Sequence, residues 1–212
     1  MSLRNRQWVL RQRPKGLIQD GDLELVETVV PDLKDAEVLV RTLYLSLDPT
    51  NRTWMNDSEG YLPPVGLGEV MRGLTLGVVE QSRSERFKAG DIVTPLSGGW
   101  ADYAVVHEQG QRPVHRAPGL PLTANLSVLG MTGLTAYFGV TDVLKAKAGE
   151  TLVISAAAGA VGSIAGQVAK QRGPRGIGIA ALSRPRQCRH RGSFPLQMHG
   201  FVQGHADDRV EE

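Results

Sequence analysis

Residues 151–166 constrain the fold of this 212-residue chain more than any other segment. They comprise an apolar strand, a tight turn of small residues and the beginning of a helix. Gly159 and Gly162 stand where a β-carbon would block the turn or an approaching ligand, and Gly166 is expected to let the helix pack closely on the strand. The sequence therefore predicts a strand–turn–helix unit of an α/β domain.

This strand–turn–helix has the order of elements that cradles the pyrophosphate of a dinucleotide. Backbone N–H groups at a helix N-terminus point at such an anion, and the helix dipole favours its charge. The spacing Ala-x-x-Gly-x-x-Gly departs from the usual Gly-x-Gly-x-x-Gly, so an ordinary turn with glycines for packing remains the alternative. The candidate cofactor-binding residues of the turn are Ala158, Gly159, Ala160, Val161, Gly162 and Ser163.

The first part of the chain shows short strand signals separated by Gly and Pro. The clearest runs are residues 37–45, 73–80 and 100–106, with a turn into a strand at residues 87–95. This pattern predicts a small, mostly antiparallel barrel or sandwich. From Leu122 to Val140 the apolar residues follow helical spacing, and Thr123 is a candidate N-cap, so we expect the domain boundary near residue 122.

The C-terminal part of the chain changes in composition. Residues 176–182 are a candidate second parallel strand, but the tail after them opens with residues 183–192, which show neither helical nor strand periodicity. We expect this tail to be poorly ordered. The alternative is an arginine-rich nucleic-acid patch. The acidic residues near the end disfavour it, and no aromatic residues are interleaved with the arginines as a stacking platform. The sequence thus predicts a β domain at 1–122, a partial α/β domain at 123–182 and an aberrant tail at 183–212.

Composition excludes several classes of protein. The net charge of +2 is too small to argue for a nucleic-acid or membrane partner. The single cysteine, Cys188, rules out a disulfide within the chain and fits a cytoplasmic location. No apolar run has the length that a signal peptide or a membrane span needs.

Five segments together resemble the zinc-independent medium-chain dehydrogenases/reductases, and best the prostaglandin reductase/leukotriene B4 dehydrogenase-like family. The resemblance covers residues 6 to about 182 and implies a GroES-like β domain followed by a Rossmann domain, α/β overall. Members of the family continue through the rest of the Rossmann fold, so we expect this chain to be truncated or frame-disturbed after about residue 182. The homodimer that the family implies would require the complete Rossmann domain. The segments that carry the resemblance are residues 43–49, 68–73, 130–137, 147–151 and 156–163.

The resemblance implies NADP(H)-dependent reduction of an activated C=C bond in an enone or 2-alkenal, impaired in a shortened chain. A quinone reductase and a non-catalytic nucleotide-binding product remain alternatives. Thr132 and Thr135 would lie near the nicotinamide, or alternatively would cap and pack their helix. Asn51 and Arg52 are candidates for the substrate side, and no residue is assigned as catalytic.

Two further expectations concern the 2′-phosphate and metal ions. Arg184 and Arg186 could supply the positive charge that a 2′-phosphate needs, since guanidinium suits phosphate. Zinc requires a tetrahedral set of N and S donors, and Cys188 stands alone while His107 and His115 have no matching cysteine. We therefore expect no metal, and reduction of a C=C bond conjugated to a carbonyl needs no Lewis acid.

Overall fold

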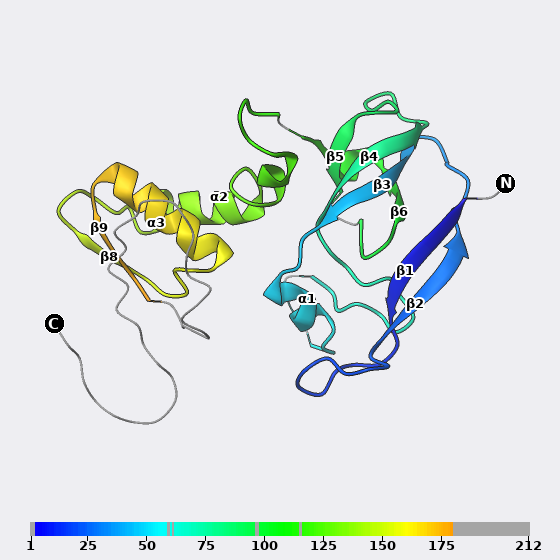
Figure 1. The fold of residues 1–212 in the computed structure, drawn as a ribbon, viewed down its shortest axis with the longest axis horizontal. Coiled ribbons are helices and arrows are strands. Elements are labelled where there is room, and N and C mark those ends of the chain that lie inside the picture. The colour runs from blue at the N-terminus through cyan, green and yellow to red at the C-terminus, as the bar shows by residue number, and fades with distance from the viewer. Residues whose placement is uncertain (1–2, 59, 61, 96–97, 115, 180–212) are drawn as a thin grey trace. The chain divides into compact units, whose positions relative to one another are not determined.

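The computed structural model describes residues 3–58, 60, 62–95, 98–114 and 116–179. The chain forms two compact units, Met1–Leu126 and Ser127–Glu212, of which the second is described to residue 179. The first unit consists mainly of β-strands and the second combines helices with strands, which confirms the predicted order of a β domain and an α/β domain (Figure 1). Among the described residues, no helix has the length and apolar character needed to cross a bilayer.

The first unit is built on a curled antiparallel sheet with the strand order β6-β3-β4-β5-β7. A separate antiparallel pair, β1 and β2, aligns Trp8 with Leu25 and Leu10 with Leu23. The longest expected strand coincides with β3, while β4 and β6 begin a few residues later than the expected runs. The strands are β1 (Arg4–Leu10), β2 (Leu23–Val29), β3 (Glu37–Leu45), β4 (Thr75–Ser82), β5 (Ile92–Pro95), β6 (Tyr103–His107) and β7 (Gln111–Pro113), with a 3-10 turn, η1 (Glu108–Gly110), before β7.

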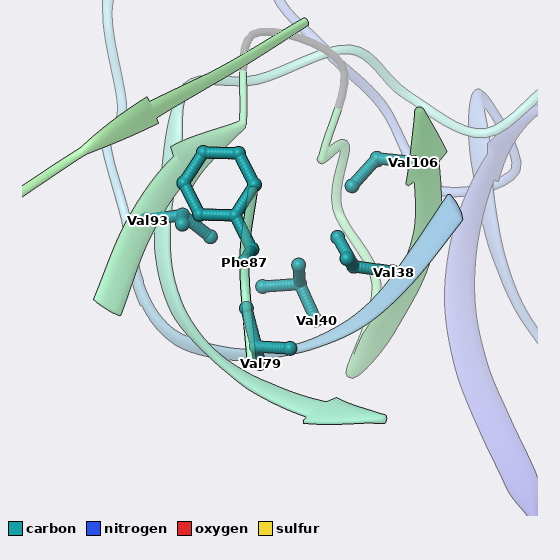
Figure 2. Packing of buried hydrophobic residues seen from close by; sticks show 6 residues of the cluster. All are labelled: Val38, Val40, Val79, Phe87, Val93 and Val106. Carbon is teal, nitrogen blue, oxygen red and sulfur yellow. The ribbon is translucent and has the colours of Figure 1, made fainter. Parts of the chain in front are cut away.

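The core of the first unit lies inside this curled sheet. Alternate residues of β3 point inward, so Val38 and Val40 pack against Val79 of β4 and Val93 of β5. Figure 2 shows these side chains converging with Phe87, from the turn between β4 and β5. Burying branched side chains from several strands removes apolar surface from water and fixes the register of the sheet.

A short helix, α1 (Pro49–Trp54), follows β3 in the first unit. Pro49 occupies its first turn, where a missing N–H costs nothing. Met55, at its C-cap, is fully buried with Leu10, Val65 and Met71 in a second apolar cluster. This cluster joins the helix to β1 and to the chain before β4.

The helix expected from Leu122 to Val140 is wrong in its extent. Residues Leu122–Leu126 form a 3-10 turn, η2, so Thr123 lies inside this turn and does not cap a helix. The carbonyl of Ser127 accepts hydrogen bonds from the N–H groups of Gly130 and Gly133, both at 3.0 Å, which closes a turn where helix had been expected. Helix α2 (Met131–Phe138) therefore begins after Gly130 and continues into a π-helical turn, η3 (Gly139–Val143).

The second unit contains a parallel strand pair. β8 (Thr151–Ile154) and β9 (Arg175–Gly178) pair in parallel, joined by helix α3 (Ala160–Arg172). Small residues of α2 and α3, including Ala136 and Ala165, form the centre of its apolar cluster with Val140. The expected second strand is thus present, although it begins one residue earlier and ends before residue 182. The division of the chain at residues 122 and 182 stays a prediction.

Candidate functional site

The strand, turn and helix expected at residues 151–166 are all present in the second unit. β8 ends at Ile154, a tight turn follows, and α3 begins at Ala160 with Gly159 as its N-cap. The turn is exposed, apart from Ala157, which is buried. Small side chains therefore leave the start of α3 open to solvent.

The hydrogen bonds of the turn leave the first N–H groups of α3 without partners. The N–H of Gly159 donates to the carbonyl of Ala156 at 2.8 Å, and the N–H of Ser163 begins the helical ladder on Gly159 at 3.0 Å. Within the described part of the chain, the N–H groups of Ala160, Val161 and Gly162 have no acceptor. Such groups carry the positive end of the helix dipole and are suited to an anion.

Both glycines of the turn lie close to the carbonyl oxygen of Ala156. A β-carbon on Gly162 would collide with this oxygen and would lie 2.9 Å from the Cα of Ala157. A β-carbon on Gly159 would lie 3.1 Å from the same oxygen. Since neither glycine has a positive φ, backbone freedom does not explain them. Close approach to Ala156 requires glycine at 162, whereas the contact at 159 is only tight.

Ala156 itself holds a left-handed backbone conformation, with φ of 50°. This conformation costs an L-residue with a side chain about 1–2 kcal/mol. Next to it, the N–H of Ala157 donates to the carbonyl of Ile179 at 2.9 Å, which ties the turn to the end of β9. No sequence pattern marks Ala156, because alanine has no preference for this conformation.

Gly166 does not have the role expected from the sequence. A β-carbon there would meet the Cδ1 of Ile154 at 3.7 Å, an ordinary van der Waals contact. The expectation that Gly166 permits close packing of α3 on the strand is therefore wrong. Close packing in this unit rests instead on Gly133, where a β-carbon would overlap the backbone of Val128.

Thr132 and Thr135 lie on α2, and both hydroxyls donate to nearby backbone carbonyls. Thr132 donates to Ser127 at 2.9 Å, and Thr135 donates to Met131 at 2.8 Å. These bonds fit the capping and packing alternative, and they leave the oxygen lone pairs free to accept. A position near the nicotinamide stays a prediction for both.

Asn51 lies on α1 in the first unit and has a structural role there. Its side chain is 5% exposed. The Oδ1 atom accepts from the N–H of Asp48 at 2.6 Å, and the Nδ2 atom donates to the carbonyl of Arg72 at 3.0 Å. The sequence Asp-Pro-x-Asn carries the signal for this arrangement, a polar cap followed by proline at the first helical position.

Arg52 fastens the chain before β2 to helix α1. Its Nη2 atom donates to the carbonyls of Pro14 at 2.9 Å and Gly16 at 2.8 Å, and its Nη1 atom donates to Asn56 at 2.6 Å. Its guanidinium thus already serves backbone carbonyls of the first unit. That Asn51 and Arg52 line the substrate side stays a prediction.

The remaining candidates lie outside the described residues. These are Arg184 and Arg186, expected at the 2′-phosphate, and Cys188 and His115, weighed as metal ligands. Among the described residues, no group of three His, Cys, Asp or Glu side chains could hold a metal ion. His107 accepts a hydrogen bond at Nδ1 from the N–H of Gln109 at 3.2 Å and caps the η1 turn.

Known proteins resemble the chain across both units. Residues 6–114 match the family described as the N-terminal domain of oxidoreductase. The chain is 40% identical over 212 residues to the NADPH-dependent curcumin reductase of Escherichia coli, which covers 99% of this chain and 59% of that protein. It is 39% identical over 175 residues to prostaglandin reductase 1 of Mus musculus, covering 82% of this chain and 51% of the relative.

A solved structure extends the likeness to the fold. The crystal structure of CurA in complex with NADPH from Vibrio vulnificus matches with a TM-score of 0.76 and 42% identity, over 83% of this chain and 52% of that one. The chain thus spans between half and three-fifths of the length of these relatives. The alignment with the E. coli protein passes residue 182, so the resemblance to known reductases does not end near that residue.

The family model matches the β domain, and the alignments with the relatives continue through the glycine turn. Both findings lead to the same conclusion. The chain belongs to the medium-chain dehydrogenase/reductase family.

Proposed function

We propose that the turn from Ala158 to Ser163 binds the pyrophosphate of NADP(H). The observation that carries this proposal is the set of three N–H groups, on Ala160, Val161 and Gly162, that have no acceptor among the described residues. They lie at the start of a 13-residue helix, on an exposed turn without a carboxylate. Three aligned donors and the helix dipole favour a phosphate group there.

The preference for NADP(H) over NAD(H) rests on the relatives. The E. coli relative is named NADPH-dependent, and the Vibrio relative was crystallised with NADPH. Arg184 and Arg186 remain the proposed partners of the 2′-phosphate, at positions outside the described residues. A cytoplasmic location belongs to the same proposal, as does a homodimer of a chain with the complete Rossmann domain.

The proposed reaction is the reduction of a C=C bond conjugated to a carbonyl. The bound cofactor supplies the hydride, while the protein positions it and shapes the electrostatics. In this chain the backbone of residues 158–163 holds the phosphates, and Thr132 and Thr135 offer oxygen lone pairs for an amide donor. Such a reaction needs hydrogen-bond donors for the carbonyl oxygen and no metal ion, so we propose a zinc-independent enzyme.

A negative charge introduced at the start of α3 tests the cofactor site. Ala160→Asp places a carboxylate where the proposal places phosphate, so it should weaken NADPH binding at least tenfold by calorimetry. The same carboxylate should stabilise the helix by about 0.3–1 kcal/mol, so lost binding will not reflect unfolding. Ala160→Asn is the matched neutral control and should bind within a few-fold of the parent chain. Equal binding by the Asp and Asn variants would place the phosphates elsewhere.

An activity assay separates the remaining alternatives. Oxidation of NADPH should be faster with a 2-alkenal than with a quinone, and a metal chelator should not change the rate. Faster turnover of the quinone would support the quinone reductase alternative. Binding of NADPH without turnover of either substrate would support a non-catalytic nucleotide-binding product, and inhibition by the chelator would contradict the absence of zinc.

A further inference from the structure

The first unit has a cavity of about 390 Å³ that uses no residue of the glycine turn. It lies between the turn that joins β4 to β5 and the chain that leaves β7. Arg86 and Phe87 come from the β4–β5 turn, while Val114 and Arg116 follow β7. Its volume suits a small organic molecule, and not only water.

Two arginines give this cavity an unbalanced positive charge. Neither Arg86 nor Arg116 forms an ion pair with another described residue. By contrast Arg83, on the same turn as Arg86, pairs with Asp35 at 3.9 Å and donates to the carbonyl of Leu33 at 2.7 Å. The cavity's own arginines are therefore available to a ligand.

Two carboxylates lie near these arginines, and both already accept hydrogen bonds. Asp91 lines the cavity and accepts from the N–H of Lys88 at 2.9 Å. Glu108 accepts from the hydroxyl of Ser84, which lowers the pKa of Glu108, and the charge of Arg86 lowers it further. With one carboxylate and two guanidinium groups in its lining, the cavity keeps a net positive charge.

The rest of the lining is apolar. Phe87 packs into the core with 7% of its surface exposed, and Ile92 and Val114 lie beside it in the cavity wall. The Cζ atom of Arg86 lies 5.5 Å from the centroid of the Phe87 ring, an arrangement in which the ring holds the guanidinium at the cavity's edge. We propose that this cavity binds a small amphiphilic anion, with a carboxylate held by the arginines and an apolar body against Phe87, Ile92 and Val114.

A pair of ligands that differ only in charge tests the site. 4-Phenylbutyrate should bind the 212-residue chain, shift the amide NMR signals of Gly90, Asp91 and Val114, and bind at least tenfold more tightly than 4-phenylbutanol. Arg116→Gln and Arg86→Gln should each weaken binding of the acid about tenfold, with little effect on the alcohol. Arg83→Gln is the matched control and should leave binding of the acid unchanged, because Arg83 already has partners.

Several results would overturn the proposal. Equal affinity for the acid and the alcohol would show a merely apolar cavity, and shifts confined to other residues would place the ligand elsewhere. An equal loss of affinity in all three arginine variants would indicate general attraction to a basic surface. Thermal unfolding of each variant should match the parent chain, since the replaced side chains are exposed, and the cavity signals should not move when NADPH is added.

Discussion

At the residue scale, the carbonyl oxygen of Ala156 determines which neighbours can carry a side chain. It lies under Gly159 and Gly162 and accepts the N–H of Gly159 at 2.8 Å. The sequence identified the two glycines but attributed them to phosphate access as well as to the turn. The structure shows that the turn requires Gly162 even without a ligand.

Two alanine substitutions on the same helix should therefore have opposite effects. Gly162→Ala should destabilise the second unit by more than 1 kcal/mol, because its β-carbon collides with backbone atoms of Ala156 and Ala157 that cannot move away cheaply. Gly166→Ala should stabilise it by about 0.5–1 kcal/mol, since alanine favours the helix and meets only Ile154 at 3.7 Å. Urea unfolding of both variants decides this, and stabilisation by Gly162→Ala would contradict the geometry of the turn.

Glu108 provides a prediction about pH. The hydroxyl of Ser84 donates to its carboxylate and, with Arg86, lowers the pKa of Glu108 below 4.5. Because the folded-state pKa is lowered, ionised Glu108 stabilises the first unit above pH 4.5, and this contribution is lost as pH falls through the lowered pKa. In Ser84→Ala, NMR titration should give a pKa for Glu108 closer to 4.5. An unchanged pKa would show that Ser84 is not the main cause.

At the element scale, patterns of apolar residues predicted strands better than helix ends. Strand β3 begins and ends where its apolar run does, and both faces of its first half are buried. The helix from Leu122 to Val140 failed because Ser127 and Gly130 close a turn that helical spacing does not reveal. Strand β1 does not stand out in the apolar pattern, because the polar residue Asn5 occupies one of its buried positions. The Asn5 side chain accepts from the N–H of Tyr103 and donates to its carbonyl.

Helix α1 depends on Asn51, and this can be measured. Asn51→Ala removes the acceptor for Asp48 and the donor to Arg72, which should cost the first unit about 1–3 kcal/mol. Thr50→Ala, one residue away on the same helix, is the matched control and should change stability by less than about 0.5 kcal/mol. A stable Asn51→Ala protein with slower turnover would instead support the expected place of Asn51 on the substrate side.

At the scale of the whole molecule, the order of the two units was readable from the sequence. Short strands with Gly and Pro preceded a strand–turn–helix, and the structure has a curled antiparallel sheet followed by the parallel pair β8 and β9. The turn between β8 and α3 was also readable, because it is made of small residues between an apolar strand and a helix; that it binds a cofactor stays a proposal. Long-range side-chain roles were not, since Asn51 and Arg52 donate to the carbonyls of Arg72 and Gly16, which lie far away in the sequence.

The central claim is that the three N–H groups at the start of α3 bind the pyrophosphate of NADP(H). Titration of the 15N-labelled chain with NADP+ tests it most directly, because each amide reports its own environment. The amide signals of Ala160, Val161 and Gly162 should move furthest among those of the second unit, and should move much less with Ala160→Asp. Signals of these residues that stay in place at saturating NADP+ would contradict the claim.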